Sequence, residues 1–279
     1  MRDQASALRA AAVPLVEPGQ AAGGREGAIV IGSGKGGVGK STLSVLLAAA
    51  MARMGRRTLL LDGSQNQGNL HILLGVRPAG TLGSILAGEA TPADLVVPVA
   101  ERLSLLPADS GAEALYSLGA IDRARLHHRL SAVYDSFDSV IVDGGPGLES
   151  VVRAAGIRAS RLVVLAVPEP ASLADAYALL KICHLQIPAV PLEVMVNLVN
   201  ADEEGRAVFD RLSLAADRFL RRGLGFLGSI RENEALRRDA RRPGALLSLA
   251  SPEVDSIAAR LAAAPAGRDR AAQMHSREG

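Results

Sequence analysis

Residues Gly34–Ser41 (GKGGVGKS) combine glycines with two lysines and a serine, and Thr42 follows them. Their spacing fits the pattern G-x-x-x-x-G-K-[ST], in which consecutive backbone N–H groups form a cradle for phosphate oxygens. Lys40 would reach the β- and γ-phosphates of a nucleotide, and the Ser41 hydroxyl would ligate Mg²⁺. The glycines let the backbone curl without Cβ clashes, and the helix expected next turns its positive end toward the anion. The predicted nucleotide contacts are Gly34, Lys35, Gly36, Gly37, Val38, Gly39, Lys40, Ser41 and Thr42.

Two aspartates stand where predicted strands end. Asp62 closes the run TLLLD, and Asp143 closes SVIVD, which leads into the glycine-rich turn Gly144–Gly147. A carboxylate at position 143 would hold Mg²⁺ through water, and the turn could bring a backbone N–H to the γ-phosphate. We expect Ser41, Asp62 and Asp143 as metal ligands, with a turn that changes shape when the γ-phosphate leaves.

Short apolar runs alternate with longer Ala- and Leu-rich stretches, and these elements must position the polar residues. Repeated strand-then-helix units predict an α/β fold with a doubly wound, mainly parallel sheet, whose ligands bind beyond the carboxyl ends of the strands. Ser33, Asp62, Asp143 and Asn197 all lie at such ends. The expected strands are Ala28–Ser33, Thr58–Asp62, Leu103–Pro107, Ser139–Asp143, Leu162–Val167, Glu193–Asn197 and Gly225–Ile230. The expected helices are Thr42–Met54, Leu82–Ala87, Arg123–Tyr134, Leu148–Ala155, Ala171–Gln186, Ala201–Arg221, Glu234–Arg242 and Pro252–Ala263.

The composition of the 279-residue chain suits one α/β domain with an Ala-, Leu- and Val-rich core, because 48% of its residues are hydrophobic and Trp is absent. A formal net charge of +2 does not imply wholesale binding to nucleic acid. The single cysteine, Cys183, excludes a disulfide framework, and no run approaches the roughly 18 apolar residues of a membrane span. These features predict a soluble, cytoplasmic protein.

We expect four segments along the chain. Residues 1–12 form a short helix-prone segment, and residues 13–27, rich in Gly, Pro and Ala, form a flexible linker. Residues 28–263 form the nucleotide-binding domain, and residues 264–279 form a polar, disordered tail. The tail lacks the bulky apolar face that an amphipathic membrane anchor needs.

The additional lysine at position 35 makes the loop resemble the deviant P-loop of the MinD/ParA family of dimeric ATPases. The resemblance implies a three-layer α/β/α P-loop NTPase fold of the SIMIBI class and an ATP-dependent homodimer. In this family the residue matching Lys35 crosses the dimer interface to the partner's phosphates, where a second cation offsets transition-state charge. Lys35, Lys40 and Asp143 would then act in Mg²⁺-dependent ATP hydrolysis.

The second loop departs from the family pattern. The family usually carries D-x-D-x-G-x-x-N, and Asp62 and Asn69 fix the register, so Ser64 replaces the second aspartate and Asn66 the glycine. The family aspartate positions the attacking water, whereas a serine carries no charge and is a poor proton acceptor. We expect Ser64, at this catalytic position, to slow hydrolysis on the order of 10²–10⁴-fold while ATP and Mg²⁺ still bind.

Two further positions resemble the family's base-side residues. Asn197 matches the adenine-reading asparagine, whose amide offers one donor and one acceptor, suited to adenine N6 and N7. The loop Gly228–Glu234 resembles the second base-side segment, with Asn233 where an aspartate is common, and it contributes Arg231 as a predicted nucleotide contact.

Two segments resemble the flagellar-number regulators FlhG (also called FleN). Pro168–Lys181 (PEPASLADAYALLK) is similar to the family's PEPTS-x-x-DAYALIK segment, and residues 3–9 (DQASALR) match its N-terminal DQAxxLR element. The resemblance implies that this helix docks on the FlhF-type GTPase and stimulates GTP hydrolysis, with Gln4 reaching the active site. It also implies a flagellar transcription regulator and C-ring proteins as partners, and a place at the cell pole or inner membrane, although no membrane-targeting helix is evident.

Two alternatives stay open. A non-hydrolysing scaffold that binds ATP or ADP as a structural ligand is compatible with Ser64. A MinD/ParA-type division or partition ATPase is compatible with the P-loop, and non-specific DNA binding or a strong C-terminal amphipathic helix would favour it; we expect no specific nucleic-acid binding. Residues 3–9 and 168–181 favour the flagellar function.

Overall fold

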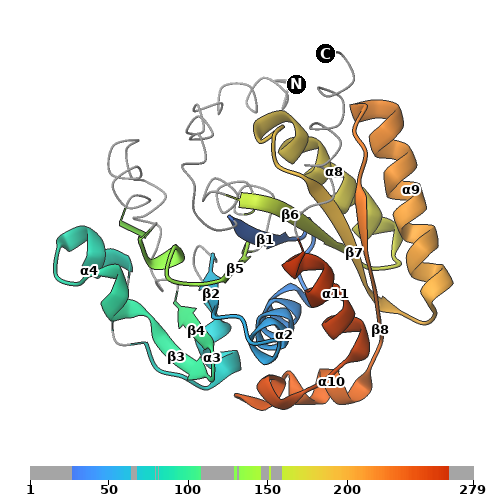
Figure 1. Cartoon of the computed structure of the whole chain (residues 1–279). Helices are drawn as coiled ribbons and strands as arrows, with labels where there is room; N and C mark the ends of the chain where they lie inside the picture. The colour runs from blue at the N-terminus through green and yellow to red at the C-terminus, as the bar shows by residue number, and fades with distance from the viewer. Residues whose placement is uncertain are drawn as a thin grey trace, which may run out of the picture.

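In the part of the chain that the structure describes, an eight-stranded sheet runs through the centre of the protein (Figure 1). This computed structural model describes residues 27–63, 68–78, 80, 82–107, 129–130, 132–145, 151 and 159–263. The strands follow the spatial order β3-β4-β2-β5-β1-β6-β7-β8, and each neighbouring pair is parallel except β3 with β4. The strands are β1 (Ala28–Gly32), β2 (Thr58–Asp62), β3 (Val97–Ala100), β4 (Leu103–Leu106), β5 (Ser139–Asp143), β6 (Ala159–Ala166), β7 (Leu192–Val199) and β8 (Gly225–Arg231).

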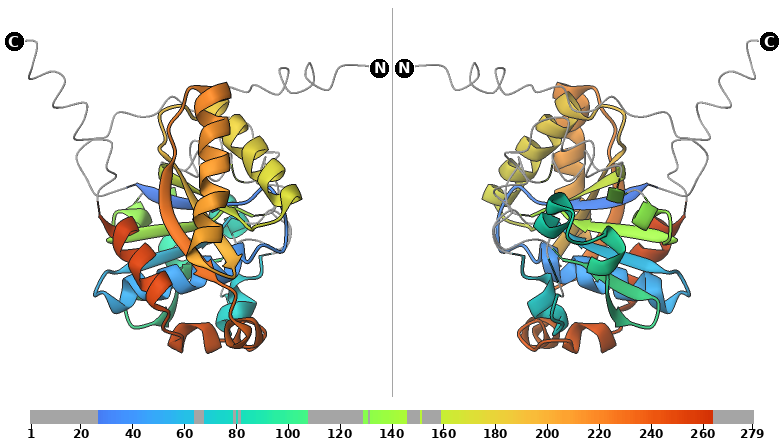
Figure 2. Two further views of the ribbon diagram at one scale, coloured as in Figure 1. Left: turned by 90° about the vertical axis from the view of Figure 1, so that its right-hand side faces the viewer. Right: turned by 90° about the vertical axis from the view of Figure 1, so that its left-hand side faces the viewer.

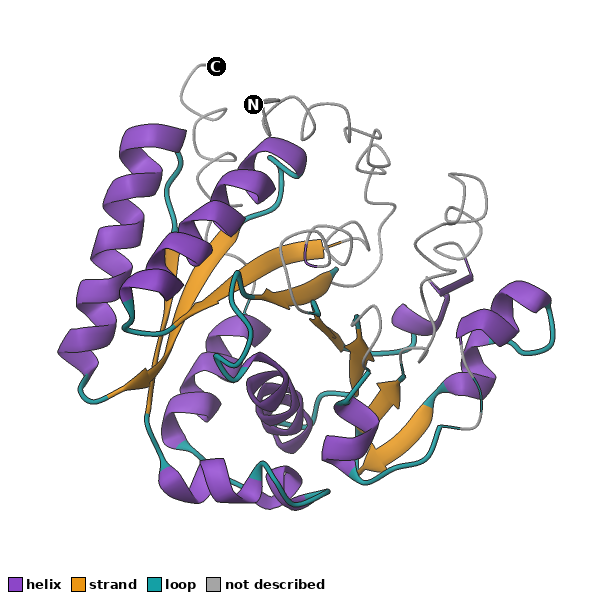
Figure 3. Ribbon diagram, turned by 180° about the vertical axis from the view of Figure 1, so that it is seen from behind, coloured by secondary structure: helices purple, strands orange, loops and turns teal. Residues whose placement is uncertain are grey.

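Helices cover both faces of the sheet, as the view from behind also shows (Figure 3). On one face α2 packs against α11 and the strands, and on the other α8 packs against α9, with separate apolar clusters beneath each layer (Figure 2). The mainly parallel, three-layer α/β/α fold is therefore confirmed. The helices are α2 (Lys40–Arg53), α3 (Leu70–Leu74), α4 (Leu82–Ala87), α8 (Pro170–Gln186), α9 (Asp202–Leu220), α10 (Glu234–Asp239) and α11 (Pro252–Ala262), with 3₁₀ turns η1 (Pro92–Leu95) and η2 (Ala245–Ser248).

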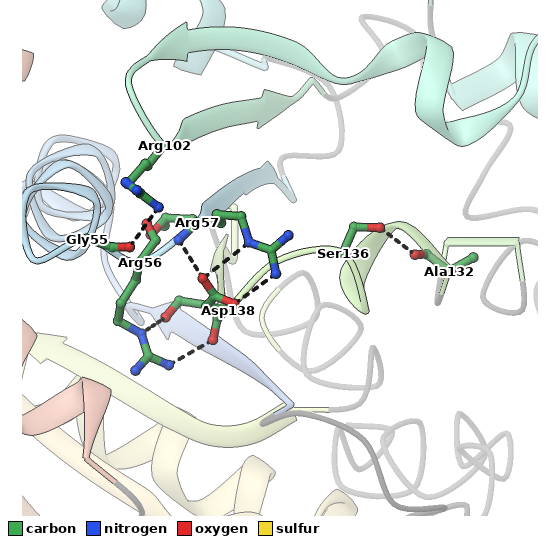
Figure 4. Close-up of polar contacts among 9 residues, drawn as sticks. Gly55, Arg56, Arg57, Arg102, Ala132, Ser136 and Asp138 are labelled. Carbon is green, nitrogen blue, oxygen red and sulfur yellow. Dashed lines mark hydrogen bonds and ion pairs between the residues drawn. The ribbon is translucent and has the colours of Figure 1, made fainter.

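The register of β2 and β5 is anchored at the end of the sheet opposite the P-loop (Figure 4). Arg56 donates to the Ser139 hydroxyl at 2.6 Å and to the Asp138 carbonyl at 2.8 Å. The Arg57 backbone N–H and guanidinium both donate to the Asp138 carboxylate, at 2.9 and 3.1 Å. These bonds join the α2–β2 turn to the start of β5, and the resulting register places Asp62 opposite Asp143 at the other end.

Most predicted elements are confirmed, and some of the exceptions have local causes. The helix predicted over Glu234–Arg242 ends at Asp239, and Pro243 excludes Arg242 from it, because proline disfavours helical backbone in the residue before it. Strand β6 begins three residues earlier than predicted, since the buried Arg161 interrupts its apolar pattern while donating to the Ala263 carbonyl at 2.8 Å. The edge strand β3 was not predicted from the sequence, since Pro98 suits only such an edge. Helix α3 was not predicted either.

The C-terminal helix α11 is part of the domain core. Its apolar residues Val254, Ile257 and Leu261 are buried against the α2 layer, so they are not presented as a membrane-binding face. Within the described ranges, none of the helices combines the length and apolarity needed to cross a bilayer. The predicted helix at 1–12, the linker predicted over 13–27 apart from its last residue, and the tail at 264–279 lie outside the described residues, as do most of 123–134 and 148–155.

Candidate nucleotide-binding site

The P-loop runs from the end of β1 to the first turn of α2. Ser33 donates from its hydroxyl to the Lys35 carbonyl at 2.9 Å, which stabilises the beginning of the loop. Gly39 precedes α2 in the left-handed conformation (φ 90°), and no side chain caps the helix. The N–H groups of the first helical turn therefore remain available to an anion, and the helix dipole favours negative charge there. Ser41 and Thr42 lie half-buried in this same turn.

Lys40 and Asp143 form a buried ion pair beneath the loop. The Lys40 ammonium donates to Asp143 Oδ1, and the two residues are only 9% and 1% exposed. The second carboxylate oxygen, Asp143 Oδ2, is buried without a hydrogen-bond partner among the described residues. A buried acceptor of this kind is costly unless a cation or donor reaches it, which fits a site built for a metal–phosphate ligand.

The two predicted metal-binding carboxylates are brought together by strand pairing. Asp62 lies directly opposite Asp143 in the β2–β5 register, and it is 3% exposed. Its Oδ2 accepts the Leu70 backbone N–H at 3.2 Å, which joins the strand to the start of α3. In the part of the chain that the structure describes, no three His, Cys, Asp or Glu side chains cluster to bind a metal by themselves. Two carboxylates and the Ser41 hydroxyl instead suit Mg²⁺, which keeps waters and shares its coordination with substrate phosphates.

The extra lysine of the loop contacts the N-cap residue of helix α8 in its own chain. Lys35 Nζ lies 2.6 Å from Glu169 Oε2, and Glu169 is the residue just before α8. The hydrogen bond to Glu169, and then its charge, raise the pKa of Lys35 above its usual value, with a smaller contribution from Asp175. Gly34 also packs against α8, because a Cβ atom there would lie 2.2 Å from the Asp175 carbonyl oxygen. The P-loop and the beginning of α8 are therefore in direct contact.

On the base side, the two predicted residues differ in their surroundings. Asn197 is 4% exposed at the end of β7 and donates from Nδ2 to the Val38 carbonyl of the P-loop at 2.8 Å. Arg231 is exposed and pairs with the Asp202 carboxylate at 2.9 Å, so a nucleotide contact by its guanidinium would compete with that carboxylate. Asn233 accepts the N–H groups of Ala235 and Leu236 and thereby caps α10.

The structure therefore brings Lys35, Lys40, Asp62, Asp143 and Asn197 to one end of the sheet. Ser64 and Gln4, predicted as catalytic and partner-binding residues, lie outside the described residues. Glu169 was not predicted as a site residue. Its contact joins positions 134 residues apart, and the sequence offered only its place in the segment Pro168–Lys181.

A parallel doubly wound sheet with this loop, buried lysine and paired strand-end carboxylates defines a P-loop nucleoside triphosphatase. A family model described as an AAA domain matches residues 27–188. The chain is 34% identical over 220 residues to the antiactivator FleN of Pseudomonas aeruginosa, covering 78% of each protein. It is 30% identical over 236 residues to the flagellum site-determining protein YlxH of Helicobacter pylori, covering 82% of this chain and 80% of YlxH. The chain belongs to this family of MinD/ParA-type P-loop ATPases.

Solved structures agree on the fold. A chain of the MinC:MinD cell division protein complex of Aquifex aeolicus is 25% identical with a TM-score of 0.69, covering 87% of this chain and 98% of that one. The Pyrococcus horikoshii septum site-determining protein MinD, solved with Mg-ADP, is 22% identical with a TM-score of 0.65, covering 84% of this chain and 95% of that one. The prediction of a MinD/ParA-type ATPase similar to FlhG is confirmed.

Proposed function

We propose that this protein is an ATP-dependent dimerising ATPase that controls the number or placement of flagella. The observation that carries the proposal is the similarity, over most of both chains, to two relatives whose names refer to flagellar control. The segment Pro168–Lys181, which suggested the same function, supplies Glu169 and Asp175 to the surroundings of the P-loop. Deleting the gene and counting flagella per cell tests the function directly: an altered number or position restored by the wild-type chain supports it, and an unchanged pattern contradicts it.

The phosphate end of the nucleotide would lie against the loop Gly34–Thr42. The backbone N–H groups of the loop and of the first turn of α2 would donate to phosphate oxygens. The Lys40 ammonium would leave the Asp143 carboxylate and bind the β- and γ-phosphates instead. Ser41, Asp62 and Asp143 would hold Mg²⁺, directly or through water. When bound, the metal neutralises negative charge that develops on the phosphates during hydrolysis.

Lys35 would change partners when two copies meet. In the single chain it contacts Glu169, whereas in the dimer it would reach the phosphates bound by the second copy, where it opposes transition-state charge. Because the contact with Glu169 is half-exposed, releasing it costs little. The dimer would create a binding surface for other proteins and disappear when the γ-phosphate is lost.

Hydrolysis in this protein would be slow because of Ser64. A serine hydroxyl can bond a water but cannot take its proton as a carboxylate can. Ser64→Asp should therefore raise kcat on the order of 10²-fold or more, measured as phosphate release from purified protein. An unchanged kcat would refute this role. A wild type that dimerises with ATP and never returns to monomers would indicate a non-hydrolysing scaffold instead.

The N-terminal element offers a specific test of the flagellar assignment. We propose that residues 3–9 bind an FlhF-type GTPase and that Gln4 orients the attacking water. Peptide 1–20 should accelerate GTP hydrolysis by the purified GTPase, and the same peptide with Gln4→Ala should not. If neither peptide has an effect, the assignment of this partner is wrong. We also propose a flagellar transcription regulator and C-ring proteins as partners, and a location at the cell pole or inner membrane.

A further inference from the structure

Asn197 connects the base side of the site to the phosphate side. It is a buried polar residue near the end of β7, and it is 4% exposed. Its Nδ2 donates to the carbonyl of Val38, 159 residues earlier in the chain and in the middle of the P-loop, at 2.8 Å. Since a carbonyl can only accept, this contact fixes which end of the amide faces the loop. The other end, Oδ1, is buried and has no hydrogen-bond partner in the described part of the chain.

The backbone around Asn197 is irregular in a way that directs its side chain. Asn197 pairs with Ile230 of β8 and Val199 pairs with Arg231, so Leu198 is an extra residue in β7. Leu198 has φ 57°, a left-handed conformation that is costly for a residue with a Cβ atom. Bulges of this kind re-aim the neighbouring side chain and are common beside functional sites. The strain at Leu198 thus accompanies the orientation of Asn197 toward the P-loop.

The P-loop, for its part, is shaped to receive the amide. Gly39, the residue after Val38, has φ 90°, and a Cβ atom there would lie 2.6 Å from Asn197 Nδ2. The amide therefore occupies the space that any larger residue at position 39 would fill. Val38 itself is 3% exposed and belongs to the apolar core on the α2 side. Two contacts thus hold the loop: the packing of the Val38 side chain in the core and the hydrogen bond from Asn197 to the Val38 carbonyl.

We propose that Asn197 is a positioning residue of the P-loop, which holds the phosphate cradle in shape through the Val38 carbonyl, in addition to any contact with the base. This inference builds on the nucleotide site proposed above. It is compatible with base recognition, because Nδ2 carries two N–H groups and only one of them donates to Val38. The buried acceptor Oδ1 remains, and it suits the exocyclic amino group of adenine better than the 6-oxo group of guanine.

The test separates cradle positioning from base recognition by using a ligand without a base. Binding of tripolyphosphate, ATP and GTP with Mg²⁺ is measured by calorimetry for the wild type, Asn197→Ala and Asn197→Asp. The aspartate keeps the shape of the side chain and its acceptors but cannot donate to Val38. Asn197→Ala should bind tripolyphosphate about tenfold more weakly, the loss expected for one buried hydrogen bond, and Asn197→Asp at least as weakly, because its carboxylate also repels the phosphates. Unchanged tripolyphosphate affinity in Asn197→Ala would overturn the proposal and leave Asn197 a base contact only.

A matched control and a ligand-free measurement complete the design. Asn200→Ala alters an exposed asparagine three residues away, which bonds Glu204 at 3.1 Å, and it should leave all three affinities unchanged. Amide hydrogen exchange on the nucleotide-free protein should become faster over residues 38–42 in Asn197→Asp and stay unchanged in the control. Unchanged exchange in both would also overturn the proposal. If the wild type binds neither ATP nor tripolyphosphate, the proposed nucleotide site fails, while hydrogen exchange still decides whether Asn197 holds the loop.

Discussion

The buried pair of Lys40 and Asp143 predicts a large and non-additive effect on stability in the absence of nucleotide. Both residues are almost fully buried, so replacing one leaves the charge of the other uncompensated beneath the P-loop. Breaking a buried pair from one side costs about 3–5 kcal/mol. For a domain of this size, about 2–4 °C is lost per kcal/mol, so Lys40→Met or Asp143→Leu should lower Tm by about 6–20 °C.

The double variant decides whether the loss belongs to the pair. Exchanging a buried ion pair for apolar residues of similar volume is often close to neutral, so Lys40→Met with Asp143→Leu should recover much of the loss. We expect the double variant to be more stable than either single variant, so its loss should be smaller than the sum of the two single losses by about 3 kcal/mol or more. Because the chain contains no Trp, urea unfolding is best followed by far-ultraviolet circular dichroism. Strict additivity would refute the reasoning, since it would mean that the two charges do not stabilise each other.

Three further predictions concern the contacts of the P-loop and the buried cysteine. Glu169→Gln removes the charge that pairs with Lys35, so half-maximal dimerisation, measured by light scattering, should need about two- to fivefold less ATP. A higher ATP concentration for half-maximal dimerisation would contradict this. Gly39→Ala combines a positive φ with a blocked Cβ position and should weaken ATP binding more than tenfold by calorimetry, whereas Gly223→Ala, outside the site and with nothing within 4 Å of the added Cβ, should not. Burial raises the pKa of Cys183 from 9.0 to about 12. The neutral thiol therefore contributes to the free energy of unfolding in full below pH 9.0, and this contribution is lost as the pH rises through about 12. Below pH 9.0 the thiol should react with a disulfide reagent only when urea unfolds the protein, and rapid reaction of the folded chain would contradict its burial.

The strands that carry the site were predictable because each combines an uninterrupted apolar run with a polar residue at its end. TLLLD and SVIVD give β2 and β5 with the bounds that the structure has. The P-loop was equally predictable, since its spacing alone requires a strand before it and a helix after it. The sequence pattern could not predict which strands pair. Asp62 lies opposite Asp143 because β2 and β5 are neighbours in the sheet, and no spacing rule predicts that order.

The contacts that were missed are all long-range. Lys35 was predicted to face a second copy, yet in the single chain it contacts Glu169, which is 134 residues away. Asn197 was expected to contact the base, which stays a prediction, but its hydrogen bond to the Val38 carbonyl, 159 residues earlier in the chain, was not predicted. Both contacts depend on how α8 and β7 are placed beside the P-loop, and local sequence carries no information on that placement.

The oligomeric response to nucleotide tests the central claim most directly. Purified protein is measured by light scattering with Mg²⁺ and ATP, with Mg²⁺ and ADP, and without nucleotide, alongside Lys35→Ala. We predict a doubled mass for the wild type with ATP alone, and a single-chain mass for Lys35→Ala in every condition even though it still binds ATP. A wild type that binds ATP and keeps the same mass in all three conditions would contradict the account.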